Sequence, residues 1–227
     1  MKKNTFILFI TLLLATFSAF AQEKTTNITV GGNPIKFPAP TAQFKEVGEE
    51  QRSLFNAFVP ESNKLLCVFL DTSDYNRLSS GNTEGIVMEK YMLIEVNSQV
   101  ESTNLGLDDF ADVKKGVASS LKTDMNEIIE DANKILKLKL EDNADVEIGK
   151  PNYLGCIYET KESYGLLMSF NIKSETKTVK KLCSLNFLRL NNRLIYIYVY
   201  CNFDDITKVK WLKNISESWA KEILKAN

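Results

Sequence analysis

The sequence predicts an α+β fold, an antiparallel β-sheet meander with helices packed on both faces (an α/β/α sandwich). Two long apolar runs flank Asn191-Asn192, and because asparagine tolerates positive φ, this pair marks a tight hairpin turn. The run LLCVFL at 65–70 is apolar at every position, which is typical of a central strand covered on both faces. Apolar residues recur at helical spacing after Leu107 and again after Asp205. The apolar strand must be buried on both faces of the sheet, and the two amphipathic helices can pack on those faces. The sequence therefore favours the sandwich.

The turn residues also predict the register of the long hairpin. If Asn191 and Asn192 are central in the turn, Phe187 faces Tyr196 and Cys183 faces Tyr200. One face, predicted to be the main core, then carries Val179, Leu185, Phe187, Leu194, Tyr196, Tyr198 and Tyr200. The other face is mixed, with Leu182, Ser184, Asn186, Leu188, Ile195, Ile197, Val199 and Cys201.

Residues 1–21 are predicted to be a secretory signal peptide. Lys2 and Lys3 precede an apolar run over 6–20, and small residues close the segment at Ala21. The apolar run is short for a membrane span, so a retained N-terminal anchor is the less favoured alternative. We expect residues 22–227 to form one exported domain, periplasmic or extracellular and soluble after cleavage, with no transmembrane segment.

A small hairpin is predicted over residues 26–37. Gly31-Gly32 supplies its turn, which places Ile28 opposite Ile35. Pro38 ends the second strand because proline cannot donate to a ladder. This hairpin precedes the sheet proper.

The segments between this hairpin and the meander alternate in type. Residues 49–58 predict a short helix, 65–70 the central strand and 86–96 a further strand rich in β-branched and aromatic residues. The short helix is expected to place three apolar side chains on one side, Leu54, Phe55 and Phe58. Residues 107–137 predict the longest helix, with acids in its first turn and lysines in its last.

The C-terminal half is predicted to be a four-stranded meander followed by a helix. The first two strands are expected over 153–160 and 164–173, with Met168, Phe170 and Ile157 on the aromatic face. Asp204 or Asp205 caps the last helix, which runs to about Lys225. Its core-facing residues are predicted to be Leu212, Ile215, Trp219 and Ile223.

Composition excludes several classes of function. The formal net charge of the 227 residues is −1, and it becomes −3 without residues 1–21, so no basic surplus indicates a nucleic-acid binder. The chain contains no histidine, which excludes Ser-His-Asp and Cys-His catalysis and histidine-based zinc sites. We expect no cofactor and no metal site.

The four cysteines and the acidic clusters leave a hydrolase open as an alternative. An even cysteine count in an exported protein suggests disulfides, but Cys183 and Cys201 are predicted to point to opposite faces, so small buried thiols are preferred. Two carboxylates across a cleft suit glycoside hydrolysis, whereas loops and helix caps account for most acids. The clusters are Asp71 with Asp74, Glu141 with Asp142 and Asp145, and Asp204 with Asp205.

A polar patch on the mixed face is the predicted binding site. Extending the register back through the meander places Ser169 and Asn171 beside Ser184 and Asn186. Polar side chains that interrupt an apolar sheet face can line a groove for a polar ligand or a peptide. The alternative is that they lie under water or are paired beneath a helix.

The order of elements resembles the PsbP/Mog1/DcrB-like α/β/α sandwich group. Four stretches are also similar to exported bacterial proteins of unknown function: IKFPAP, PESNKLL over 60–66, Tyr91-Met92 and Asp109-Phe110-Ala111. The resemblance implies an accessory or binding module, and no functional residue carries over from it.

We therefore expect a non-enzymatic secreted or periplasmic accessory protein that engages an envelope partner protein or a small ligand. The competing hypothesis is an envelope hydrolase that uses paired carboxylates or a cysteine thiolate. Facing carboxyls in a pocket, or an exposed cysteine beside a lysine, would favour the hydrolase.

Overall fold

A computed structural model describes residues 25–81, 88–120, 133, 147–174 and 177–227. The expected signal peptide, the expected helix beyond residue 120 and the Glu141, Asp142 and Asp145 cluster lie outside these residues.

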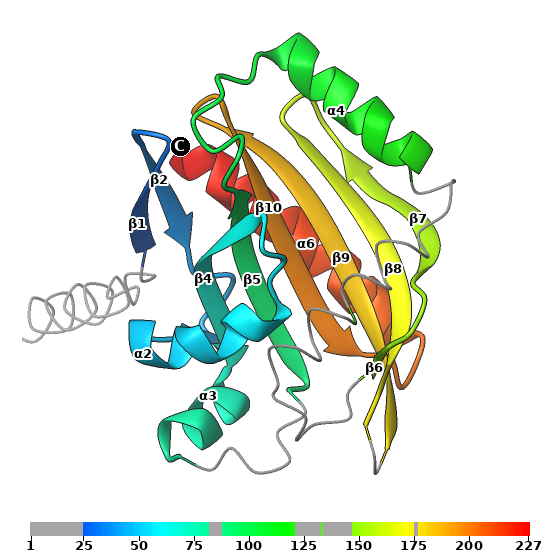
Figure 1. The fold of residues 1–227 in the computed structure, drawn as a ribbon. Coiled ribbons are helices and arrows are strands. Elements are labelled where there is room, and N and C mark those ends of the chain that lie inside the picture. Colours follow the sequence, from blue (N-terminus) through cyan, green and yellow to red (C-terminus); the bar gives the residue numbers. More distant parts are fainter. Residues whose placement is uncertain (1–24, 82–87, 121–132, 134–146, 175–176) are drawn as a thin grey trace, which may run out of the picture.

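The described residues form two sheets and the helices around them (Figure 1). A two-stranded sheet pairs β1 (Thr25–Val30) with β2 (Asn33–Pro38). The eight-stranded sheet contains β3 (Phe44–Glu46), β4 (Asn63–Asp71), β5 (Lys90–Asn97), β6 (Glu147–Ile148), β7 (Asn152–Glu159), β8 (Ser163–Lys173), β9 (Thr178–Leu190) and β10 (Arg193–Asn202). The helical elements are α2 (Glu49–Arg52), the 3-10 helix η1 (Ser53–Phe58), α3 (Thr72–Ser79), α4 (Leu107–Ser120) and α6 (Thr207–Ala226).

The large sheet is antiparallel, with strand order β3-β4-β5-β10-β9-β8-β6, and β7 also pairs with β8. Helix α6 covers one face, while η1, α3 and α4 pack on the other (Figure 1). The α+β fold with helices on both faces is therefore confirmed. No helix among the described residues has the length and apolar character needed to cross a bilayer.

The predicted hairpin register is confirmed. Asn191 and Asn192 have φ of 47° and 61°, and Phe187 pairs with Tyr196. Cys183 pairs with Tyr200 while Cys201 pairs with Leu182, so the two thiols lie on opposite faces as predicted. In the small hairpin Ile28 pairs with Ile35, also as predicted.

The prediction of which sheet face holds the main core was wrong. The largest buried cluster lies on the mixed face, beneath α6, where Leu212, Trp219 and Ile223 pack on Leu188 and Ile197. The tyrosine face, which we define as the side carrying Tyr91, Glu95, Phe187, Tyr196, Tyr198 and Tyr200, holds two smaller clusters and is half-buried at Tyr196, Tyr198 and Tyr200. The mixed face holds the main core because the long amphipathic helix α6 covers this face along its length.

Three local predictions also differ from the structure. The helix over 49–58 is one α-turn followed by 3-10 helix, and Leu54 and Phe58 are exposed while Phe55 is buried, because three residues per turn do not keep an α-helical stripe. Helix α3 was not predicted, since only Asp74 and Leu78 of its residues are buried.

The third difference is Ile157, which packs with the core beneath α6 instead of on the aromatic face. Two register shifts in β7, between Tyr153 and Gly155 and between Cys156 and Tyr158, account for this change of face.

Candidate functional site

The structure places Ser184 and Asn186 in the interior beneath α6. Ser184 Oγ lies 2.5 Å from Ser216 Oγ of the helix. Asn186 Nδ2 donates to the carbonyl of Ile197 at 2.9 Å and to Ser184 Oγ at 3.0 Å, and its Oδ1 accepts from the Tyr158 hydroxyl at 2.8 Å. This arrangement matches the alternative in which the polar residues are paired beneath a helix.

Ser169 and Asn171 share this face but lie farther along the sheet. Ser169 is buried opposite Leu182, and Asn171 is exposed opposite Lys180. The residues opposite Ser184 and Asn186 are Leu167 and Gly165. The four predicted site residues therefore share one face of the sheet, where Ser184 and Asn186 belong to an internal network and Ser169 and Asn171 occupy separate positions farther along β8.

Gly165 makes room for this network. A Cβ atom on Gly165 would lie 2.4 Å from the ring of Tyr158, which reaches across it to Asn186. The polar residues thus fix β7, β8 and β9 under α6.

A depression on the described surface lies between α2 and η1 on one side and β4 on the other. Its volume is about 460 Å³. It is lined by Glu49, Arg52, Ser53, Asn56, Asn63, Lys64, Leu65 and Ser98. We call it the β4 depression. A smaller one, of about 210 Å³, lies at the outer edge of the sheet beside Phe44, Lys45 and Tyr75.

Asn63 connects the β4 depression to the interior of the sheet. Its Nδ2 donates to Glu95 Oε2 at 2.9 Å, and Glu95 is only 2% exposed. Glu95 pairs with Leu65 on one side and Tyr196 on the other, so it lies on the tyrosine face. Two residues that line the depression, Asn63 and Leu65, therefore contact or flank a buried carboxyl.

The surroundings of Glu95 hold it near the midpoint of its titration at neutral pH. Burial raises the pKa of Glu95 from its usual 4.5 to about 7, and the hydrogen bond from Asn63 opposes that rise. Burial, and then the nearby Glu95, raises the pKa of the Tyr196 and Tyr198 hydroxyls. Among the titratable groups that face it, Glu95 is the one that changes charge near neutrality.

The cations around the β4 depression already have partners. Arg52 Nη1 donates to the Leu66 carbonyl at 2.5 Å, and Lys64 Nζ lies 3.7 Å from Glu101 Oε1. Within the described part of the chain, neither Glu49 nor Glu95 has a cation within 4.0 Å.

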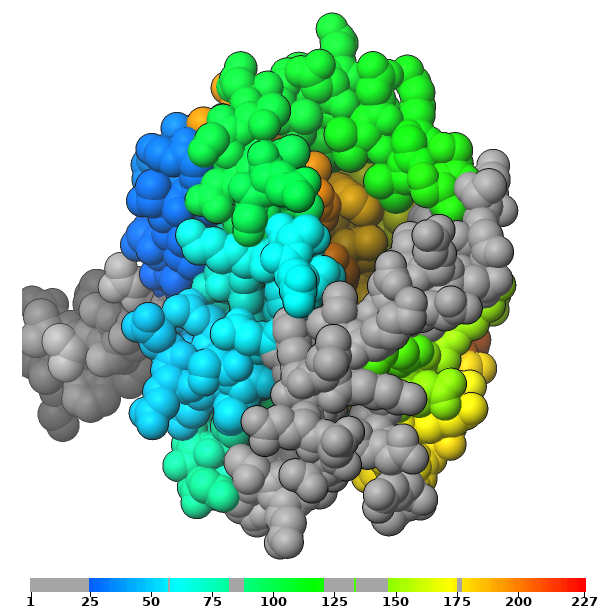
Figure 2. Space-filling view, in the orientation of Figure 1, coloured from blue at the N-terminus to red at the C-terminus, as the bar shows by residue number. Residues whose placement is uncertain are grey.

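Beside Glu95, aromatic rings continue across the tyrosine face. Tyr196 meets Phe187 edge-on at 5.6 Å, and Tyr200 stacks on Tyr91 at 4.5 Å and on Tyr198 at 6.2 Å. Figure 2 shows atoms of β9 and β10, coloured orange, in a recess between the cyan atoms of the α2–β4 region and the green atoms of α4. These rings flank Glu95 on the tyrosine face, whereas the lining of the β4 depression is mainly polar and contains no aromatic residue.

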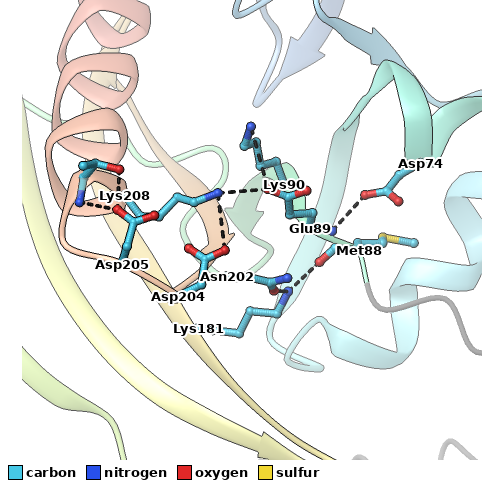
Figure 3. Close-up of polar contacts among 10 residues, drawn as sticks. Asp74, Met88, Glu89, Lys90, Lys181, Asn202, Asp204, Asp205 and Lys208 are labelled. Atoms are coloured by element: carbon cyan, nitrogen blue, oxygen red, sulfur yellow. Dashed lines mark hydrogen bonds and ion pairs between the residues drawn. The ribbon is translucent and has the colours of Figure 1, made fainter.

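A second polar cluster lies at the opposite end of the sheet (Figure 3). Lys181, which is 2% exposed, donates to the Met88 carbonyl at 2.5 Å and to Asn202 Oδ1 at 2.6 Å. Lys208 Nζ lies 3.0 Å from Glu89 Oε1, and the Glu89 amide donates to Asp74 Oδ2 at 2.9 Å. These groups bind one another, so the cluster joins α3, β5, β9, β10 and α6.

The cysteine thiols considered for a hydrolase have raised pKa values, and two of the acids considered for it accept hydrogen bonds at helix starts. All four cysteines are free, and Cys156 is the exposed one. Burial raises the pKa of the Cys67 thiol to about 12 and that of the Cys201 thiol to about 11. Partial desolvation also raises the pKa of the Cys156 thiol. Asp71 accepts from the Ser73 amide at 2.9 Å and Asp205 from the Thr207 amide at 2.6 Å, as capping residues do. In the described ranges no three His, Cys, Asp or Glu side chains gather to hold a metal ion.

Sequence reasoning missed both Asn63 and Glu95. One signal was available. Glu95 interrupts the apolar strand YMLIEV, and a glutamate is rarely buried unless its carboxyl has a partner. No local pattern connects it to Asn63, which lies 32 positions earlier.

Comparison with known proteins gives no family, and several solved structures align with the chain. No family model matches the sequence, and no curated protein matches it. The solution structure of CyanoP, the cyanobacterial PsbP of Synechocystis sp. PCC 6803, aligns with a TM-score of 0.40 and 11% identity over 88% of this chain and 94% of that one.

The Saccharomyces cerevisiae Ran-binding protein Mog1p aligns with a TM-score of 0.33 and 10% identity over 90% of this chain and 95% of that one. A mutant of Mog1 gives a TM-score of 0.31 and 10% identity, covering 89% and 92% of the two chains. All three alignments cover most of both chains at a low sequence identity.

Proposed function

We propose that this chain is an exported, non-enzymatic binding protein whose ligand occupies the β4 depression. The observation that carries the proposal is that Asn63 both lines the depression and binds the buried carboxyl of Glu95. Ligand sites are typically concave, with a few polar groups placed by the scaffold, and volumes of roughly 300–1,000 Å³ are usual.

The scaffold around the depression supports this role. Asn63 begins β4, and Ser98 follows β5, where its amide donates to the Ser62 carbonyl at 2.8 Å. Arg52 is held on the other side by its bond to Leu66. Side chains on paired strands keep their positions better than side chains on loops, which suits a preorganised site.

The hydrolase alternative is not proposed. The two described depressions each contain one acidic side chain, Glu49 in one and Glu46 in the other, and the thiols have raised pKa values.

The experiment compares two variants of the domain over residues 22–227. Ser98→Trp fills the β4 depression, and Ser119→Trp places the same ring on the exposed surface of α4. Each protein is passed through envelope extract, repurified and weighed by native mass spectrometry.

We expect the wild type and Ser119→Trp to retain the same added mass and Ser98→Trp to lose it. Retention of that mass by Ser98→Trp would show that the ligand lies elsewhere. Circular dichroism melts of the variants confirm that each one is folded.

A further inference from the structure

The lining of the β4 depression carries more positive than negative charge. Arg52 and Lys64 are the cations of the lining and the exposed Glu49 is its acid, which leaves a balance of one positive charge. Glu95 is buried behind Asn63 and lies outside the lining. A balance of this sign attracts an anion and repels a cation.

The guanidinium of Arg52 is held in place, but most of its donors are still available. Nη1 donates to the neutral carbonyl of Leu66 at 2.5 Å, and no carboxylate among the described residues lies within 4.0 Å of this side chain. Nε and Nη2 have no acceptor in the described part of the chain. Arginine presents such N–H groups side by side in one plane, the geometry that binds both oxygens of a carboxylate.

Lys64 and Ser98 add a second charge and a hydroxyl to the lining. Lys64 Nζ lies 3.7 Å from Glu101 Oε1, which is longer than a hydrogen bond, and the lysine side chain is 55% exposed. Ser98 Oγ has no hydrogen-bond partner within the described ranges. A loose, exposed ion pair contributes little to stability, so an incoming anion can share Lys64 with Glu101.

The rest of the lining favours a hydrophilic ligand. Ser53, Asn56 and Asn63 carry hydroxyl or amide groups, and Leu65 is the apolar residue of the lining. Hydroxyl and amide side chains select ligands that exchange hydrogen bonds with them. A hydrocarbon ligand would cover these polar groups without replacing the hydrogen bonds that they make to water.

We propose that the occupant of the β4 depression is a small hydroxylated carboxylic acid, bound as its monoanion. Its carboxylate binds the unoccupied edge of Arg52 and the ammonium of Lys64, and its hydroxyl groups bind the polar side chains of the lining. A single negative charge matches two cations and one acid, whereas a dianion exceeds that balance. This inference rests on the proposed function and names the class of its ligand.

The test uses four probes: gluconate, glucitol, hexanoate and inorganic phosphate. Glucitol has a hydroxymethyl group where gluconate has its carboxylate, hexanoate keeps the carboxylate but has no hydroxyl groups, and phosphate is an oxyanion of higher charge. Each is titrated into the ¹⁵N-labelled domain at neutral pH and low ionic strength, and the amide shifts of Asn63, Lys64 and Ser98 are followed.

Gluconate is expected to bind most tightly of the four. We expect its affinity to exceed that of glucitol about tenfold, the factor that one charged hydrogen bond supplies. We expect it to exceed the affinities of hexanoate and phosphate by about threefold or more, because hexanoate makes no hydroxyl contacts and phosphate carries excess charge.

Three variants of basic residues test the proposed contacts. Arg52→Gln removes the planar fork and its charge, Lys64→Gln removes the exposed ammonium, and Lys161→Gln changes an exposed lysine between β7 and β8 as the matched control. We expect gluconate binding to weaken about tenfold in Arg52→Gln and about threefold in Lys64→Gln, and to stay unchanged in Lys161→Gln. Since Arg52 also binds the Leu66 carbonyl, circular dichroism checks the folding of its variant, and Lys64→Gln tests the same site without removing that bond.

The outcomes separate this inference from the proposed function. If glucitol binds as tightly as gluconate, the depression remains a binding site but the carboxylate is wrong. Equal or tighter binding of hexanoate would overturn the hydroxylated class, and tighter binding of phosphate would overturn the monoanion. If gluconate gives no saturable shift, or if Arg52→Gln and Lys64→Gln bind it as Lys161→Gln does, the whole inference is overturned. The proposed function fails separately, when Ser98→Trp retains the mass from the extract.

Discussion

Asn63 donates a hydrogen bond of 2.9 Å to Glu95, and this contact joins a surface depression to the buried tyrosine face of the sheet. Asn63 begins β4, whereas Glu95 is near the end of the antiparallel neighbour β5. Because Glu95 titrates near neutral pH, the charge behind the depression depends on pH in the range where most proteins work.

Glu95→Gln is expected to remove a pH-dependent cost to stability. The folded-state pKa of about 7 exceeds the usual 4.5, so between these values the native state binds more protons than the unfolded state. The contribution of Glu95 to the free energy of unfolding therefore falls as pH rises through this window, by roughly 2–3 kcal/mol.

Urea denaturation of the wild type and of Glu95→Gln, at about pH 5 and about pH 8.5, measures this change in stability. Glu95→Gln is expected to match the wild type at the lower pH and to exceed its stability at the higher one. Equal differences at the two pH values would contradict the raised pKa. Glu101→Gln, at an acid that is paired with Lys64 on the surface, is the control.

Lys181→Met tests the buried lysine at the other end of the sheet. Burial lowers the pKa of Lys181 from 10.5 to about 8, so between these values the unfolded state binds more protons than the native state. Wild-type stability relative to Lys181→Met is therefore expected to rise between about pH 7.5 and about pH 10.5, by roughly 2–3 kcal/mol. Guanidinium denaturation measures the difference, and Lys180→Met, at the exposed neighbour, is expected to show no such trend.

The Ser184–Ser216 contact is expected to couple the sheet to α6. Each single alanine variant leaves the partner hydroxyl buried without this bond, at a cost of roughly 1–2 kcal/mol. The double variant removes both hydroxyls and is expected to cost less than the two single changes together, by about 1 kcal/mol. A double-mutant cycle from thermal melts gives the coupling, and strict additivity would show that the contact contributes nothing.

The sequence contained enough information for the hairpin and the last helix. Two consecutive asparagines fix the turn because both adopt positive φ, and the register of ten residue pairs follows from that turn. The apolar spacing of Leu212, Ile215, Trp219 and Ile223 likewise predicts the buried stripe of α6.

The apolar pattern of the hairpin could not predict which face of the sheet holds the main core. Tyrosine has an apolar ring and a polar hydroxyl, so a tyrosine-rich face can be core or half-buried, and the helix that docks decides between them. The bulges that move Ile157 to the other face, and the meeting of Asn63 with Glu95, depend on pairings between strands that no local motif specifies.

Asn191→Ala and Asn191→Gly are expected to differ in stability. Both remove the bond from Asn191 Nδ2 to the Pro34 carbonyl, but only glycine accepts φ of 47° without strain. The alanine variant is therefore expected to be less stable than the glycine variant by about 1 kcal/mol. Chemical denaturation measures the gap, and no gap would mean that the turn relaxes to another conformation.

Asn227, which follows α6, is hydrogen-bonded to β2. Asn227 Oδ1 accepts from the Lys36 amide and Asn227 Nδ2 donates to the Lys36 carbonyl, both at 2.8 Å, while Trp219 Nε1 donates to the Pro38 carbonyl at 2.8 Å. A ribosome delivers the chain from its amino end and therefore releases β1 and β2 long before α6, on which β2 packs. Completion of the native topology waits for the final turn of α6, and chaperones have that interval in which to act.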